Sequence, residues 1–194
     1  MVQIQVPQPY IGFLMIKKYK LDVPFIVSTF EEHNRIKDTL LNLLELQPAI
    51  KEDGSRTGFQ SCDKIAKTDY YIDKSFPRNY WSLLFPYLDK HMAPVLSMLD
   101  LKSCNYSDFW FQQYELLDTH AWHRHNRCFY SNVYYLELPA DGPKTIFKNP
   151  FNSNEIICPD VKEGDILTFP SILEHCSPPN SSIDRKTIIS FNID

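Results

Sequence analysis

The sequence lacks a run of basic residues, a long apolar stretch and any closely spaced pair of cysteines. Its 194 residues carry a formal net charge of −4, and its one short basic cluster spans residues 17–20. The broad positive surface of a nucleic-acid-binding protein is therefore not expected. No segment approaches the ~20 apolar residues of a membrane span, and the first residues, MVQIQVPQPYIGF, do not have the pattern of a signal peptide. We expect neither a nucleic-acid partner nor a membrane span.

The five cysteines are scattered, odd in number and without a CxxC pair. This argues against a disulfide framework and against a cysteine-ligated zinc site, and it favours a reducing compartment. We therefore expect a cytoplasmic protein. Hydrophobic residues at 43% and aromatic residues at 14% are sufficient for a packed core, so a disordered chain is excluded. The length fits a single domain over residues 1–194.

The first part of the chain, residues 1–105, reads as short strands followed by supporting helices. Short apolar runs separated by prolines predict two or three strands over residues 2–27. Residues 29–32, Thr-Phe-Glu-Glu, have the form of a capping box, and apolar residues at helical spacing follow as far as Pro48. A helix is therefore predicted here, with His33 on its solvent-facing side.

A second helical region follows a long connection. Residues 49–76 read as a long loop, and a loop of that length inside a compact domain is usually functional, so it is a candidate cover for a site. Residues 77–101 contain an apolar stripe interrupted by Pro86 and Pro94. This predicts a kinked helix or two helices in series, with His91 in a structural role. Both helical regions are expected to pack on the outside of a sheet.

From Asp108 onward the sequence is strand-like, and residues 106–194 are expected to form the β core. Short turns containing glycine and proline separate the strands, which favours a sandwich or jelly roll. The fold class is therefore predicted to be α+β, mainly β, with supporting helices on the N-terminal side. The predicted strands are Phe109–Leu117, Phe129–Leu138, Lys144–Phe147, Glu155–Ile157, Asp165–Phe169 and Lys186–Asn192.

Three of the six histidines lie within six positions in a strand-like, aromatic region: His120, His123 and His125. In an extended strand the side chains of His123 and His125 point to the same face. Neutral imidazole is a common ligand of zinc and iron, so the two form half of a metal site. His175 is the candidate third ligand. The alternative interpretation is that these histidines are packed core residues with no metal.

Arg185 lies ten residues after His175, at the start of the last predicted strand. If residues 178–183 connect two antiparallel strands, His175 and Arg185 lie near one another. A planar guanidinium beside a metal can hold a ligand carboxylate through two hydrogen bonds. The alternative is a solvent-facing charge at a strand end.

Taken together, these motifs resemble the 2-oxoglutarate- and Fe(II)-dependent oxygenases, in particular a group found in phages and marine bacteria. That group has an HxH pair, an SGVYYL-like strand, EGD followed by FPS, a later histidine, a PN pair and R-x-S-x-S-F-N. The resemblance covers residues 107–194 and, more weakly, residues 57–61. The matching elements here are His123-Arg124-His125, Ser131–Leu136, Glu163–Ser171, His175, Pro179-Asn180 and Arg185–Asn192.

The resemblance implies a double-stranded β-helix, the jelly roll also used by cupins. It implies Fe(II) bound by His123, His125 and His175, with 2-oxoglutarate as cosubstrate and Arg185 on its distal carboxylate. Thr187 and Tyr114 are implied as further cosubstrate contacts. The implied reaction takes O2, converts 2-oxoglutarate to succinate with loss of CO2, and hydroxylates an unidentified prime substrate. A protein side chain or a small molecule is expected as that substrate, and the acidic net charge disfavours a nucleobase.

One feature departs from most of the superfamily, which has a carboxylate at the position of His125. Three neutral ligands leave the site one charge more positive, which affects redox potential and also allows metals other than iron. Asp118 or His120 is an alternative ligand. A cupin-like three-histidine protein of another class, such as a thiol dioxygenase or an isomerase, is a second hypothesis. A jelly-roll binding module without catalysis is a third.

Overall fold

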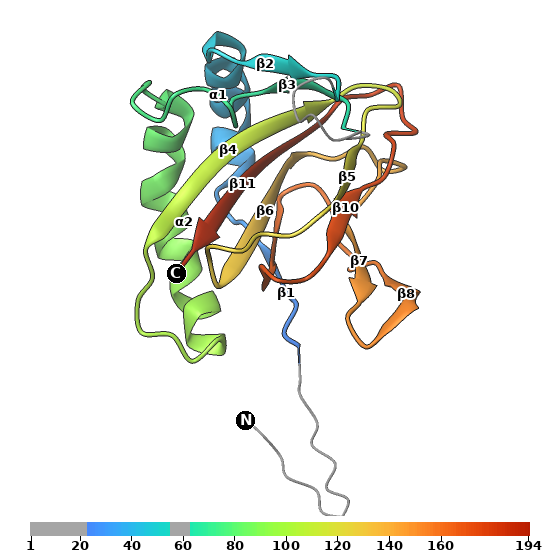
Figure 1. Cartoon of the computed structure of the whole chain (residues 1–194). Coiled ribbons are helices and arrows are strands. Elements are labelled where there is room, and N and C mark those ends of the chain that lie inside the picture. Colours follow the sequence, from blue (N-terminus) through green and yellow to red (C-terminus); the bar gives the residue numbers. More distant parts are fainter. Residues whose placement is uncertain (1–22, 55–62) are drawn as a thin grey trace, which may run out of the picture.

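A computed structural model describes residues 23–54 and 63–194, which form two antiparallel sheets and two helices (Figure 1). The larger sheet has the strand order β1-β9-β6-β11-β4-β3-β2, and the smaller has the order β5-β10-β7-β8. This is the predicted jelly-roll arrangement, in which strands distant in sequence become neighbours. The strands of the larger sheet are β1 (Ile26–Thr29), β9 (Asp165–Pro170), β6 (Tyr130–Glu137), β11 (Lys186–Ile193), β4 (Tyr106–Tyr114), β3 (Ile65–Thr68) and β2 (Ile50–Glu52). Those of the smaller sheet are β5 (His120–His123), β10 (His175–Ser177), β7 (Ile146–Asn149) and β8 (Asn152–Ile157).

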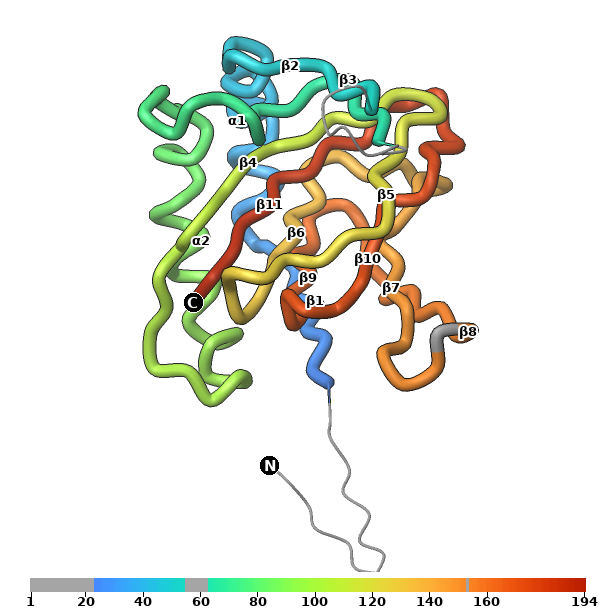
Figure 2. The backbone as a smooth tube through the Cα atoms, in the orientation of Figure 1, coloured from blue at the N-terminus to red at the C-terminus, as the bar shows by residue number. Residues whose placement is uncertain are grey.

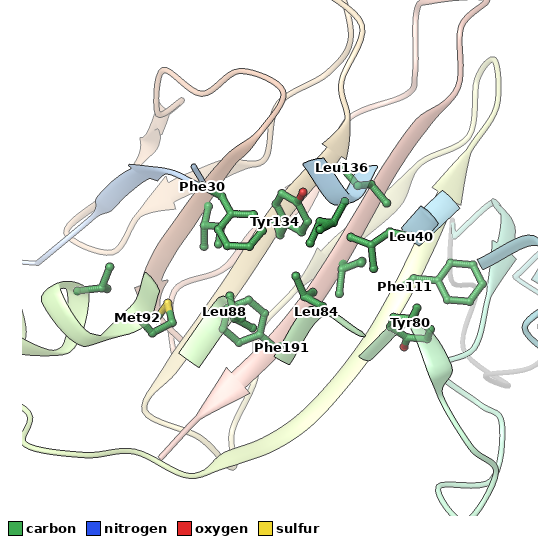
Figure 3. Packing of buried hydrophobic residues seen from close by; sticks show 14 of the residues in the cluster. Phe30, Leu40, Tyr80, Leu84, Leu88, Met92, Phe111, Tyr134, Leu136 and Phe191 are labelled. Atoms are coloured by element: carbon green, nitrogen blue, oxygen red, sulfur yellow. The ribbon is translucent and has the colours of Figure 1, made fainter. Parts of the chain in front are cut away.

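Helices α1 (His33–Leu46) and α2 (Asn79–Met98) cover the outer face of the larger sheet, as predicted (Figure 1). Their apolar stripes pack against side chains of β4, β6 and β11, and each fully buried leucine contributes about 1.5–3 kcal/mol to this packing. Figure 3 shows the core between the helices and the sheet. Its members include Leu40, Leu84, Leu88, Met92, Phe111, Tyr134 and Phe191.

Strand β11 is buried along both faces. Ile189, Phe191 and Ile193 belong to the core under the helices. The alternate residues, including Ile188 and Ser190, face the space between the two sheets. Because side chains alternate along a strand, one element builds the core on one side and a cavity wall on the other.

The start of α1 differs from the sequence prediction. Residue Thr29 belongs to β1, and its hydroxyl donates to Asp165 Oδ1 at 2.8 Å instead of capping the helix. No side-chain hydrogen bond caps α1. The prediction that His33 is a surface residue is also wrong. The side chain is buried against Gly164, and His33 Nδ1 lies 2.8 Å from the hydroxyl of Tyr134.

Of the two alternatives predicted for residues 77–101, two helices in series is wrong, because one continuous helix contains both Pro86 and Pro94. The prediction of one long loop over residues 49–76 is also wrong, because they include β2 and β3. The predicted strands within residues 1–22, and residues 57–61, lie outside the described residues. Within the described part of the chain, no helix has the length and apolar character needed to cross a bilayer.

A buried ion pair ties β3, α2 and β4 together. Asp69 Oδ2 accepts hydrogen bonds from Arg78 Nε at 2.7 Å and from the Tyr80 hydroxyl at 2.9 Å, and Oδ1 accepts from the Phe111 amide at 2.9 Å. Both partners of the ion pair are buried. One carboxylate, just after β3, therefore satisfies donors from the start of α2 and from β4.

We predict that Asp69→Asn lowers the free energy of unfolding by about 3–5 kcal/mol, because it leaves the buried Arg78 guanidinium without its counter-charge. Chemical denaturation at pH 7 measures this. Asp160→Asn is the matched control, since Asp160 also pairs with a cation, Lys144, but is fully exposed. Its unfolding midpoint should equal that of wild type. Equal midpoints for the two variants would contradict the prediction.

Candidate metal centre

Three histidines converge at one end of the space between the sheets. His123 ends β5 and lies opposite His175 on the neighbouring strand β10. His125 follows β5, and its backbone amide donates to the Ser171 carbonyl at 2.9 Å. Figure 2 shows the connection after β5 passing from the small sheet to the large one. One ring nitrogen from each histidine lies within 4.8 Å of the others, so all three can bind one ion.

The three rings present the same nitrogen to the common centre. His123 Nδ1 lies 2.8 Å from the Ala121 carbonyl, and His175 Nδ1 lies 2.8 Å from the Leu173 carbonyl. A carbonyl oxygen only accepts, so each Nδ1 carries the hydrogen and each Nε2 keeps a free lone pair. His125 Nδ1 lies 3.2 Å from Asn192 Oδ1. This pattern of Nδ1 bonds is that of metal-ligating imidazoles.

Burial keeps these rings neutral. Desolvation lowers the pKa of His123, lowers the pKa of His125 to about 4, and lowers the pKa of His175 well below its usual value. Mutual repulsion between the rings adds to the effect at His125 and His175. At neutral pH a cation entering the site therefore displaces no proton.

The alternative ligands Asp118 and His120 are placed differently. Asp118 Oδ2 accepts the Glu115 amide at 2.9 Å, so this carboxylate closes a turn. The ring of His120 lines the cavity and stacks on His123 with a centroid distance of 3.9 Å. His120 Nδ1 lies 3.4 Å from Gln112 Nε2. Neither residue belongs to the converging set of the described residues.

Tyr114, one of the three residues expected at the cosubstrate, does line the cavity between the sheets. It is buried, and its hydroxyl donates to Gln112 Oε1 at 3.0 Å. The aromatic rings of Trp110 and Phe169 line the same cavity. Aromatic rings therefore form part of the cavity wall near the histidines, of which His175 is buried and His123 and His125 are partly exposed.

Arg185 and Thr187 are not brought to this cavity. Arg185 forms ion pairs with Glu137 at 2.9 Å and with Glu45 of α1 at 2.7 Å. Thr187 donates its hydroxyl to the same Glu137. Both side chains therefore lie on the helix-facing side of the sheet. The expected contact of Arg185 with a cosubstrate carboxylate is not available from this face.

Lys186, the neighbour of Arg185, points to the inward face of the sheet. Its side chain is fully buried, and Nζ donates to Ser177 Oγ at 2.8 Å and lies 5.0 Å from the centre of the Tyr114 ring. No carboxylate of the described residues pairs with it. Burial lowers its pKa to about 7. Strand parity contained the missing signal, because Lys186 alternates with Ser190 and Asn192 on the inward face.

Residues 108–192 match the family model described as "Putative 2OG-Fe(II) oxygenase". This segment is under half of the chain, and over it the sequence is similar to the 2OG-Fe(II) oxygenases. The match includes all three converging histidines and Lys186. It confirms the resemblance to this family read from the sequence and supports an oxidoreductase that uses Fe(II) and 2-oxoglutarate. A comparison with curated proteins gave no match.

Solved structures of such oxygenases share the fold of this chain. A 2OG-Fe(II) oxygenase family oxidoreductase from Burkholderia pseudomallei has a TM-score of 0.69 at 9% identity, covering 88% of this chain and 85% of that one. The viral collagen prolyl hydroxylase of Paramecium Bursaria Chlorella virus-1, in its 2OG complex, has a TM-score of 0.55 at 15% identity, with coverages of 87% and 94%. A prolyl hydroxylase from Trichoplax adhaerens, in complex with a hypoxia inducible factor peptide fragment, has a TM-score of 0.61 at 15% identity, covering 87% of this chain and 82% of that one.

The buried Lys186 generates a prediction about stability and pH. Its folded pKa of about 7 lies below the ordinary value of 10.5. Between these values the unfolded chain holds a proton that the native amine has lost, so the stability of the ligand-free protein rises with pH. We predict that the difference in unfolding free energy between wild type and Lys186→Met changes by about 1.4 kcal/mol per pH unit from pH 7.5 to 9. Urea denaturation at several pH values measures it, and parallel profiles would contradict it.

Proposed function

We propose that the protein is a hydroxylase in which His123, His125 and His175 bind Fe(II) and 2-oxoglutarate is the cosubstrate. The observation that carries this proposal is the closeness of two features. Three imidazoles present free Nε2 atoms to a common point, and a buried lysine, which pairs with no carboxylate of the described residues, bonds to Ser177 in the wall of the same cavity. The first feature suits a divalent cation, and the second suits an organic anion.

The donor set fits Fe(II). Imidazole nitrogen is a common ligand for iron, and most 2-oxoglutarate oxygenases use two histidines and one carboxylate. Here His125 stands in place of the carboxylate, so the bound metal keeps its full double charge. A metal held by three neutral ligands attracts a chelating anion more strongly than a metal held by two histidines and a carboxylate.

We assign the distal carboxylate of 2-oxoglutarate to Lys186 in place of Arg185 and Thr187. A buried ammonium carries a desolvation penalty that a carboxylate partner offsets. Ser177, which already accepts a hydrogen bond from Lys186 Nζ, can donate its own hydroxyl hydrogen to the same carboxylate. Tyr114 packs its ring below the ammonium and so keeps the proposed contact of the sequence analysis.

When bound together, Fe(II) and 2-oxoglutarate activate O2 for hydroxylation of a C–H bond, with 2-oxoglutarate leaving as succinate and CO2. The protein's own residues bind and orient the metal and the cosubstrate, and they exclude water. The histidines hold the metal with fixed tautomers, and Lys186 holds one end of the cosubstrate. The aromatic walls from Trp110 and Phe169 keep water out of the cavity. We propose a protein side chain or a small molecule as prime substrate, and the peptide-bound Trichoplax adhaerens relative supports the former.

We further propose that residues 1–194 act as one domain in a reducing compartment. The core under α1 and α2 consists of the outer face of the sheet that also walls the cavity. This shared sheet supports a single folding unit. Cys104, Cys128, Cys158 and Cys176 are all free, which supports a compartment where thiols stay reduced.

A three-histidine site of another class, such as that of a thiol dioxygenase, remains the second candidate, because the three neutral ligands favour it. It predicts metal binding without 2-oxoglutarate binding. It also gives no role to a buried ammonium in the cavity. Succinate formation separates the two functions.

We predict that anaerobic titration of the Fe(II) protein with 2-oxoglutarate produces a visible metal-to-ligand charge-transfer band. His175→Ala should abolish the band by removing a metal ligand. Lys186→Met should weaken the affinity for 2-oxoglutarate at least tenfold, because its carboxylate then enters an apolar pocket without a partner. Absorbance against 2-oxoglutarate concentration gives both results.

Arg185→Ala is the matched control, since it removes a neighbouring cation from the other face of the sheet. Its titration curve should overlay that of wild type. If Arg185→Ala weakens binding and Lys186→Met does not, the assignment of the carboxylate is wrong. Metal binding without any band would favour the second candidate, and no metal binding would overturn both.

A further inference from the structure

The third histidine of the site is held differently from the other two. His123 and His175 each donate Nδ1–H to the backbone carbonyl of the residue two positions earlier, Ala121 in β5 and Leu173 just before β10. The partner of His125 is a side chain, Asn192 Oδ1, at 3.2 Å. Backbone conformation thus fixes two tautomers, whereas the third depends on a residue that a mutation can change.

Asn192 is itself oriented by its neighbours. It lies directly opposite Ser131 in the register of β11 and β6, and Ser131 Oγ donates to Asn192 Oδ1 at 2.9 Å. Ser131 Oγ also lies 2.9 Å from Ser171 Oγ. Asn192 Oδ1 accepts from Ser131 and also faces His125 Nδ1, so Asn192 offers His125 an acceptor.

We propose that Asn192 is a positioning residue that makes His125 a metal ligand, by accepting Nδ1–H and leaving Nε2 free for the ion. This inference rests on the three-histidine metal site proposed above. It extends that site to a hydrogen-bonded chain of His125, Asn192, Ser131 and Ser171, in which Ser131 fixes the amide and the amide fixes the imidazole.

The chemistry couples Asn192 to the identity of residue 125. An imidazole ligand needs an acceptor at its second nitrogen, because the alternative tautomer would turn a hydrogen toward the metal. A carboxylate ligand at position 125 has no such requirement. It would instead be repelled by Asn192 Oδ1, and turning the amide to offer Nδ2 would require Ser131 to change from donor to acceptor. His125 and Asn192 therefore act as a pair.

The test measures the dissociation constant of Co(II) by visible absorption, without cosubstrate. We expect Asn192→Leu, which keeps the size but removes the acceptor, to bind Co(II) about 10–100-fold more weakly than wild type. Asn192→Asp keeps an acceptor and should bind Co(II) with an affinity within ~3-fold of that of wild type. Ser131→Ala leaves Asn192 in place without its anchor and should give a smaller loss, ~3–10-fold.

Thr168→Val is the matched control. Thr168 donates to Asn132 Oδ1 at 2.6 Å, so the variant loses a buried side-chain hydrogen bond in the same sheet. Neither residue contacts a histidine through a hydrogen bond, and Co(II) affinity should match wild type. Thermal melts of the metal-free variants test folding. If Asn192→Leu does not fold, Ser131→Ala and Asn192→Asp carry the comparison.

A double-mutant cycle separates positioning from a merely structural role. In the His125→Asp background, adding Asn192→Leu should not weaken Co(II) binding, because a carboxylate needs no Nδ1 partner and is repelled by Asn192 Oδ1. An equal loss in both backgrounds would overturn the inference and leave the metal site intact. Unchanged Co(II) binding by the single variant Asn192→Leu would also overturn the inference and leave the metal site intact. Absence of Co(II) binding in wild type would overturn the metal site and this inference with it.

Discussion

Strand β11 is the element on which the rest of this structure depends, because it is buried along both faces. On one face, isoleucine and phenylalanine side chains form the floor under α1 and α2. On the other, Lys186, Ser190 and Asn192 meet the interior between the sheets. The apolar packing of the first face fixes the register of the second. A slip of one residue would exchange the two sets and bury the charged side chain in the wrong layer.

The electrostatics of the interior follow from this arrangement. The cavity holds imidazoles that burial keeps neutral, and one amine whose burial lowers its pKa to about 7. A divalent metal and a dianionic cosubstrate would cancel each other's charge there, and the ammonium would then add one positive charge. A carboxylate ligand at position 125 would cancel that charge. With three histidines this positive charge remains, which favours an anionic prime substrate once metal and cosubstrate are bound.

Much of this organisation could be predicted from the sequence, and the errors have physical causes. The HxH pattern named His123 and His125, with His175 as the candidate third ligand, and the structure brings the three together, although His125 lies just after β5. Arg185 was predicted to hold the cosubstrate carboxylate because a guanidinium can hold a carboxylate through two hydrogen bonds. The direction of its side chain depends on strand parity, which a shift of one residue reverses. The pairing of Arg185 with Glu45 across 140 positions has no local signal.

The strands missed by sequence reasoning are short ones. β5 and β10 have four and three residues, too few to show an alternating pattern, yet they carry two of the three converging histidines. The prediction that His33 lies on the surface was wrong because contacts with remote segments decide its burial. Its burial comes from Gly164, whose positive φ of 86° lets the backbone approach the ring, and from Tyr134 on a distant strand. Contacts between remote segments decide these positions.

The three histidines are thus held in two different ways, which differ in how a substitution affects them. His123 and His175 rely on backbone carbonyl groups two residues earlier in the chain, so their tautomers depend on backbone conformation and not on a particular side chain. His125 relies on Asn192, and Asn192 relies on Ser131 on the next strand. The first arrangement is a property of the fold, and the second is a property of particular side chains. The ligand at position 125 is therefore the part of the metal centre that substitution can alter without rebuilding the β-helix.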